Sequence, residues 1–347
     1  MTTIPPDRHT GLPEPDAVAS AHSARVLDQI RADITATGGG ISFARYMDLA
    51  LYAPGLGYYR AGTRKFGPDG DFVTAPELSP LFSRCLARQC RQILEQIGGG
   101  AIIELGAGTG IMAADILREL QILAALPERY AILETSGELR QRQRQTLAKR
   151  TPDLLERVVW LDTLPEPGLR GIVLGNEVLD ALPVERFRIT ANGPRRLRVI
   201  WNDADPATPT GTGLTWDEDG EDPELTAAVA LIETGLGRHL PVGYVSEYVP
   251  HLADWVRAIA EPLAAGALLF VDYGYSHREY YHPERTDGTL LCHYRHRVHA
   301  DPLILPGLQD ITASVDFTAV ADAARAAGLK LAGYTSQNYF LFGCGLM

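Results

Sequence analysis

The sequence predicts an α/β fold, a doubly wound parallel sheet with an N-terminal helical region and a β-rich insertion between strands 4 and 5. Short apolar segments alternate with helical ones, which is typical of parallel strands joined by crossover helices. These segments are AIIEL, YAILE, RVVWL, GIVLG and ALLFVDY, within residues 101–273. A glycine-rich turn follows the first of them, at the sheet edge where ligands bind in this architecture.

The chain before the sheet is predicted to be largely helical. Residues 1–22 lack the apolar centre of a signal peptide, so we expect a disordered tail there. Apolar residues up to Ile97 recur at helical spacing, Thr74 and Glu77 fit a capping box, and glycines at 98–100 end the helix. Residues 23–98 are therefore expected to form a helical region with a Gly-rich lid, in which Asp71, Thr74 and Glu77 are candidate ligand contacts.

An insertion is predicted at residues 185–243, between the two parts of the core, 99–184 and 244–347. ERFRIT and RRLRVIW alternate polar and apolar residues around NGP, which indicates a hairpin. Residues 202–224 are polar and acidic and are expected to form a loop. Residues 317–334 are expected to form a helix followed by a strand.

Composition narrows the possible partners and location. The 347 residues are 46% hydrophobic and 22% charged, which is ordinary for a soluble globular protein. A net charge of −11 argues against nucleic-acid binding and favours a cationic partner. The longest apolar run, 263–271, is too short to insert in a membrane. Four cysteines without CxxC spacing indicate a reducing, cytoplasmic location.

The turn after the first strand has the pattern E-x-G-x-G-x-G, from Glu104 to Gly110. A dinucleotide fingerprint, GxGxxG, would need glycine where Ile111 stands. The pattern instead resembles motif I of S-adenosylmethionine (SAM) methyltransferases. Glycine lets ligand atoms lie against bare backbone, so Gly106, Ala107, Gly108 and Gly110 are predicted to line the SAM site, with Glu104 holding the amino group of SAM. A tight turn without a ligand is the alternative.

Two acids after later strands are further candidates for SAM binding. Glu134 ends the second strand, where an acid accepts hydrogen bonds from ribose hydroxyls. Asp162 follows the third strand and is a candidate contact for the adenine amino group. Solvated loop acids are the alternative for both.

Several longer segments together resemble the MidA/NDUFAF7-type SAM-dependent methyltransferases. They are ISFARYMDLALYAPGLGYY, GDFVTAPELSPLF, IIELGAGTG, LETSGELRQRQ, GNEVLDALPV, LLFVDYGY, RTDGTLLCHYRH and DITASVDF. The resemblance spans roughly residues 25–340 and implies a Rossmann-like SAM-methyltransferase core. Mitochondrial members are protein arginine methyltransferases required for assembly of respiratory complex I, which implies a protein substrate, with a complex I subunit as the candidate, and allows a homodimer.

The C-terminus departs from that family. Members continue past TSQNYF with a helix and a closing antiparallel strand, whereas this chain ends at Met347. The expectation is an open slot in the sheet, with unpaired backbone groups beside strand 5.

Acids near the SAM turn suggest the chemistry. Asn176, Glu177 and Asp180 follow the fourth strand, and the two acids, three residues apart, could face one way on a helical turn. Carboxylates bind a guanidinium bidentately and accept the proton that it releases. Our hypothesis is that this pair binds the acceptor, with Glu247 as a further acid on the substrate side. Helix capping by Asp180 and loop contacts of Asn176 are the alternative.

A histidine-rich segment, CHYRHRVH, invites a metal hypothesis. His293, His296 and His299 are interleaved with arginines and have no adjacent carboxylate, so a surface or lid segment is favoured and no metal is expected. Three functions stay open: a protein arginine methyltransferase, a small-molecule N- or O-methyltransferase, and an assembly factor that binds SAM without catalysis.

Overall fold

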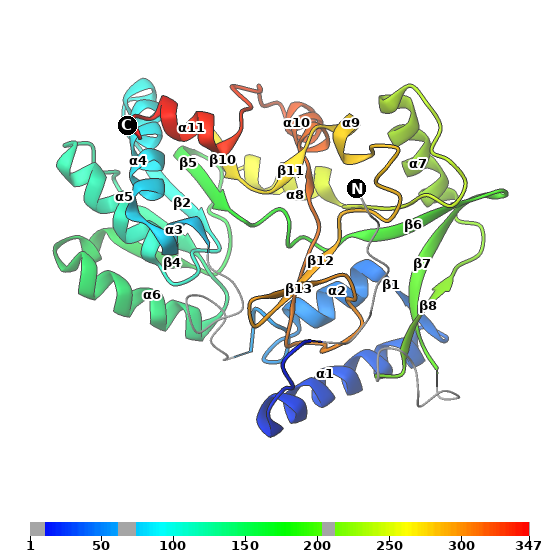
Figure 1. The fold of residues 1–347 in the computed structure, drawn as a ribbon. Coiled ribbons are helices and arrows are strands. Elements are labelled where there is room, and N and C mark those ends of the chain that lie inside the picture. The colour runs from blue at the N-terminus through cyan, green and yellow to red at the C-terminus, as the bar shows by residue number, and fades with distance from the viewer. Residues whose placement is uncertain (1–10, 62–73, 203–211, 347) are drawn as a thin grey trace.

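The central sheet has five parallel strands in the order β10–β5–β2–β3–β4 (Figure 1). The structure is a computed structural model and describes residues 11–61, 74–202 and 212–346. The strands are β2 (Ala101–Leu105), β3 (Tyr130–Leu133), β4 (Val158–Leu161), β5 (Leu169–Asn176) and β10 (Leu263–Val271). All five apolar segments predicted as parallel strands therefore form, and the parallel sheet is confirmed.

Helices cover both faces of this sheet, as a doubly wound fold requires. They are α4 (Pro80–Ile97), α5 (Ile111–Ile122), α6 (Gly137–Arg150) and the 3-10 helix η1 (Pro152–Arg157), with α8 (Leu252–Ala260) on the other face. Successive side chains of a strand point to opposite faces. Accordingly Ile102 packs with α4 and α5, whereas Ile103 packs with Ile259 of α8.

A second, antiparallel sheet joins the insertion to the rest of the chain. Its strands are β1 (Gly40–Ser42), β7 (Gly193–Trp201), β6 (Glu185–Thr190) and β9 (Val245–Tyr248) in that order, with β8 (Leu214–Glu218) also paired to β7. The predicted hairpin is confirmed as β6 and β7. The loop prediction for 202–224 is wrong at β8, whose residues pair with β7, and residues 203–211 lie outside the described part.

The N-terminal region contributes to this same sheet. Helix α1 (Ala17–Ala36) begins where Asp16 Oδ1 accepts hydrogen bonds from the amides of Val18 (3.0 Å) and Ala19 (2.8 Å). The prediction of a disordered tail up to residue 22 is therefore wrong from residue 17 onward. Helix α2 (Phe43–Tyr52) follows, and β1 pairs with β7. The helical region and the insertion thus share a sheet and a core.

The segment predicted as one helix from Thr74 to Ile97 is two helices, α3 (Ala75–Leu78) and α4. Ser79 between them is extended, with φ −160° and ψ 141°, because a residue before proline is disfavoured in the helical region. The predicted capping box does not form, since the Thr74 side chain makes no cap hydrogen bond. Asp71 and the lid before Thr74 lie outside the described residues.

The elements of the C-terminal part are β11 (Gly274–Tyr275), α9 (His277–Tyr280), β12 (Leu291–Tyr294), β13 (Arg297–His299), β14 (Asp310–Thr312), β15 (Val315–Asp316), α10 (Phe317–Ala326) and α11 (Gln337–Gly343), and helix α7 (Pro223–Leu236) belongs to the insertion. The C-terminal part packs at three places: α10 against α8, α11 against α4, and β12 and β14 against the core of the N-terminal helices (Figure 1). The strand predicted after α10 does not form, because residues 329–335 are exposed and pair with no strand. Among the described strands β10 has one neighbour, β5. Within the described residues, every helix is too short or too polar to cross a membrane.

Candidate functional site

The glycine turn after β2 needs glycine at its three alternating positions. Gly106, Gly108 and Gly110 have φ of +62°, +50° and +80°, values that strain residues with a side chain. A Cβ on Gly110 would also lie 3.0 Å from the Cα of Gln143. Gly110 is the N-cap of α5, so the turn changes direction between strand and helix within five residues.

A cavity of about 910 Å³ opens over this turn, within the range of small-molecule sites, about 300–1,000 Å³. Most predicted site residues line it: Thr74, Glu77, Glu104, Gly106, Ala107, Gly108, Glu134, Asn176, Glu177 and Asp180. Gly110, Asp162 and Glu247 are not among its lining residues. One hollow therefore combines the predicted cofactor residues with the predicted substrate acids.

Glu104 is a buried carboxylate with one oxygen left over. Its Oε2 accepts a hydrogen bond from the Tyr130 hydroxyl at 2.6 Å, while its Oε1 has no hydrogen-bond partner among the described residues. Burial raises the pKa of Glu104 to about 7, and the Tyr130 hydrogen bond opposes this. An unpaired buried carboxylate oxygen is costly, and a cationic ammonium in the cavity would satisfy it. The residues present therefore fit SAM.

Glu134 lies at the other side of the turn and is oriented by its neighbours. Its Oε1 accepts a hydrogen bond from the Ser136 amide at 2.8 Å, and its Oε2 accepts one from Gln143 Nε2 at 3.2 Å. Gln143 also donates to the Gly108 carbonyl and accepts from Trp160 Nε1. Gln143 was not predicted, because its role follows from packing of α6 against the turn.

Of three other site predictions for this region, the structure contradicts the one for Asp162. Asp162 is 84% exposed and pairs with Arg140 at 2.7 Å, so it turns toward solvent and does not face the cavity. Glu77 lines the cavity, but it accepts a hydrogen bond from the hydroxyl of Thr109 in the glycine turn. Thr74 also lines it. Glu77 therefore supports the glycine turn, whereas the sequence predicted that it would cap a helix.

The acids after β5 lie beside the turn, but on an irregular loop and not on the expected helical turn. Glu177 has φ +52°, a left-handed conformation that costs a non-glycine residue about 1–2 kcal/mol. The Val178 side chain is 3.6 Å from where a Cβ of Gly106 would stand. Glu177 and Asp180 thus share the cavity because the chain turns sharply after the strand.

Two acids that the sequence analysis missed surround this pair. Asp272 directly follows β10, and Asp310 lies on β14 and lines the cavity. Burial, then the charges of Asp272 and Asp310, raises the pKa of Glu177 to about 7. The same causes raise the pKa of Asp180 well above its usual range. Such acids gain by binding a cation, which favours their ionised forms.

Two tyrosines from the N-terminal region hold these segments from the other side. The Tyr52 hydroxyl donates to the Ala181 carbonyl at 2.8 Å, and the Tyr59 hydroxyl donates to Asp310 Oδ1 at 2.7 Å. Their rings stack 5.5 Å apart, and both line the cavity. Tyr52 ends α2 and Tyr59 lies in the segment that follows it, and the sequence gave no signal for this role.

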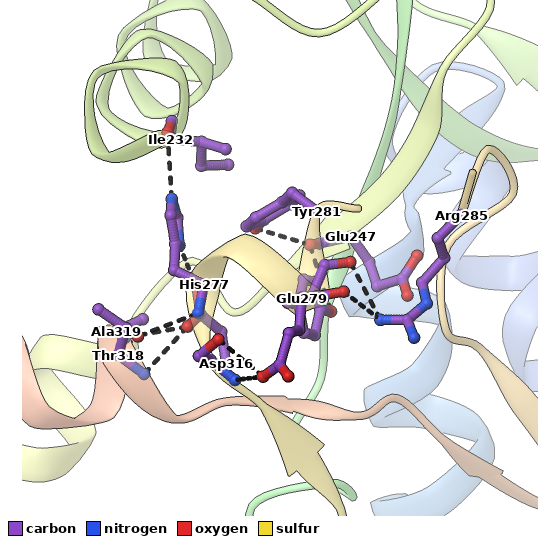
Figure 2. Close-up of polar contacts among 11 residues, drawn as sticks. Ile232, Glu247, His277, Glu279, Tyr281, Arg285, Asp316, Thr318 and Ala319 are labelled. Carbon is purple, nitrogen blue, oxygen red and sulfur yellow. Dashed lines mark hydrogen bonds and ion pairs between the residues drawn. The ribbon is translucent and has the colours of Figure 1, made fainter. Parts of the chain in front are cut away.

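Glu247 is a structural residue and does not face the cavity. It is fully buried on β9, and its carboxylate accepts hydrogen bonds from the Thr289 amide and from the Thr289 hydroxyl (2.6 Å). Figure 2 shows it beside Tyr281, whose hydroxyl donates to the Glu247 carbonyl at 3.2 Å. The prediction of a substrate acid fails because β9 belongs to the second sheet.

The same region joins α7 to the C-terminal segment. The His277 ring contacts Asp316 Oδ2 through Nδ1 (2.6 Å) and the Ile232 carbonyl through Nε2 (3.1 Å) (Figure 2). Asp316 in turn caps α10 through the amides of Thr318 and Ala319. These contacts anchor the segments that carry the cavity wall at residues 310–314.

The histidine-rich segment is a hairpin of β12 and β13, in which Cys292 pairs with His299. A helical face of histidines therefore does not form, and His293 alone of the three lines the cavity. No group of three metal-binding side chains exists within residues 11–61, 74–202 and 212–346.

Known proteins resemble this chain over most of its length. Residues 85–335 match the model of a family described as S-adenosyl-L-methionine-dependent methyltransferases. A crystal structure from Burkholderia thailandensis, bound to S-adenosyl-homocysteine, superposes with a TM-score of 0.89 and 45% identity, covering 97% of this chain and 84% of that chain.

Curated relatives point the same way. The mitochondrial protein arginine methyltransferase NDUFAF7 of Danio rerio is 30% identical over 94% of this chain and 78% of its own length. Human NDUFAF7 is 28% identical over 89% and 70%. The cavity of this chain is lined by a buried acid, Glu104, and two left-handed glycines, Gly106 and Gly108, and the chain belongs to the NDUFAF7-type family of SAM-dependent methyltransferases.

Proposed function

We propose that this methyltransferase modifies an arginine side chain of a protein substrate. The observation that carries the proposal is a set of three acids, the buried Asp180 and Asp310 and the half-buried Glu177, that lines the cavity beside the SAM turn. A guanidinium is a planar cation that carboxylates bind bidentately. The name of the relatives, protein arginine methyltransferase, supports the same substrate class.

Residues of this chain orient the guanidinium and accept its proton. SAM, when bound, supplies a methyl group already activated on a sulfonium. Arginine stays protonated in water, with a pKa above about 12, so the site must localise its charge and take up one proton. Glu177 and Asp180 hold the guanidinium and accept the proton that the nitrogen loses as it attacks the methyl carbon and the bond from that carbon to sulfur breaks. The cavity wall excludes water while the reacting atoms align.

Glu177→Gln tests this role, with Glu138→Gln on the exposed face of α6 as the matched control. The rate of tritium transfer from labelled SAM into lysate proteins should fall about 100-fold or more in the first variant, with the SAM dissociation constant unchanged. The label should be recovered as methylarginine after acid hydrolysis. An unchanged rate removes Glu177 from the mechanism, and label in small molecules alone contradicts the protein substrate.

The finer assignments rest on the family resemblance and on composition. A complex I subunit as substrate, a homodimer and the absence of nucleic-acid partners remain proposals. The relatives are named mitochondrial, whereas cysteine usage in this chain predicts a cytoplasmic location. Identification of the labelled lysate proteins by mass spectrometry tests the substrate directly.

A further inference from the structure

Asp272 directly follows β10 and lies beside the acid loop at residues 177–180, on the side away from the SAM turn, because β5 lies between β10 and β2. Strand β10 pairs with β5 up to Val271 and Asn176, so Asp272 and Glu177 leave the sheet side by side. The Glu177 amide donates to the Val271 carbonyl at 2.9 Å. Asp272 does not line the cavity, so any effect that it has on the reaction acts through the loop.

The Asp272 carboxylate accepts four backbone hydrogen bonds. Its Oδ2 accepts from the amides of Val178 (3.1 Å), Leu179 (2.8 Å) and Asp180 (3.3 Å). Its Oδ1 accepts from the Tyr273 amide at 2.8 Å. Successive N–H groups converging on one oxygen form an anion-binding nest. The carboxylate therefore sets the path of the loop that follows Glu177.

Two further hydrogen bonds hold this loop in position. The Ala313 amide donates to the Asp180 carbonyl at 2.9 Å, and the Tyr52 hydroxyl donates to the Ala181 carbonyl. The Val178 side chain faces Gly106 of the SAM turn. A shift of this loop would thus move both acids relative to the methyl donor.

We propose that Asp272 is a positioning residue for methyl transfer, which holds residues 178–180 so that Glu177 and Asp180 face the methyl acceptor. The proposal rests on the role given to those two acids under the proposed function. The role of Asp272 differs from theirs, because its carboxylate bonds to backbone amides and does not line the cavity.

Asp272→Asn tests the proposal with little change in shape. Whichever way its amide is turned, the NH2 group of asparagine faces a backbone N–H, so the hydrogen bonds accepted by one of the two carboxylate oxygens are lost. Asp254→Asn, at an exposed acid on α8, is the matched control. We expect transfer of label from tritiated SAM to fall about 100-fold, with the SAM dissociation constant unchanged, and the control to behave as the wild type.

The pH profile separates positioning from a general loss of structure. Glu177 is faced by Asp272, Asp180, Asp310 and Tyr273, and Asp272 contributes to its raised pKa. Removing that charge should move the acid limb of the residual rate to lower pH. A rate that falls equally at every pH would contradict the proposal, as would a wild-type rate in Asp272→Asn.

Hydrogen exchange tests the same contacts without an activity measurement. In the wild-type protein the amides of residues 178–180 should exchange at least about tenfold more slowly than in an unstructured peptide, and Asp272→Asn should reduce this protection, because a neutral amide oxygen accepts more weakly than a carboxylate oxygen. Unprotected wild-type amides would overturn the role of Asp272, even if the variant failed to fold. Wild-type protein that transfers no label would contradict the proposed function alone, so the two failures are distinguishable.

Discussion

Replacing Glu104 by glutamine should strengthen the ligand-free fold at alkaline pH while weakening SAM binding. Folding raises the pKa of this carboxyl from 4.5 to about 7 through burial. Between these values the native state keeps a proton that the unfolded state has released. The free energy of unfolding therefore falls as pH rises through this window, and the loss is complete above about pH 8.

The magnitude follows from the width of that window. At about 1.4 kcal/mol for each pH unit, the ionised carboxylate destabilises the ligand-free protein by about 3 kcal/mol. Glutamine has nearly the same shape, and its carbonyl can still accept the Tyr130 hydrogen bond. Glu104→Gln should recover most of this free energy at pH 8 and little of it at pH 5. Its SAM affinity should fall about 10- to 100-fold, because the ammonium loses a charged partner.

Urea unfolding of both proteins from pH 5 to 8.5, without SAM, measures the first effect, and calorimetric titration of SAM at pH 7.5 measures the second. Comparing wild type with variant isolates the contribution of Glu104 to stability from those of Glu177 and Asp272. These two carboxyls, with pKa values of about 7 and about 6, titrate in the same pH range. If the free energies of unfolding of the two proteins changed with pH in parallel, the argument that burial raises the pKa of Glu104 would be refuted. Equal SAM affinities would refute its role in cofactor binding.

Two further substitutions test the cofactor site. Gly110→Ala places a methyl group in left-handed backbone, 3.0 Å from the Gln143 Cα, and should lower the free energy of unfolding by about 1–3 kcal/mol. Gly137→Ala, with open space around its Cβ, serves as the control. Equal melting temperatures of the two variants would contradict the requirement for glycine at position 110. Asp162→Asn should leave the SAM dissociation constant within about twofold, since an exposed ion pair contributes little, whereas a loss above about tenfold would restore its predicted adenine contact.

The sequence alone was sufficient for the sheet and the cofactor turn. Short apolar strands, crossover helices and alternating glycines are local patterns, and each is decided by residues close together in the chain. Glu104 and Glu134 were also predictable, because parallel strands place their carboxyl ends at one edge. Ser79 could have been predicted as a helix break from Pro80 alone.

Tertiary structure decided the rest of the site, because its members are distant in sequence. Tyr59 meets Asp310 across about 250 residues, and Asp272 reaches the loop after β5 from a neighbouring strand. Glu247 and Asp162 are acids after or within strands, like Glu134, yet pairing in the second sheet buries the first and Arg140 draws the second to solvent. Acid type and local spacing do not encode these contacts, which depend on how the central sheet, α2 and the C-terminal segments pack around one cavity.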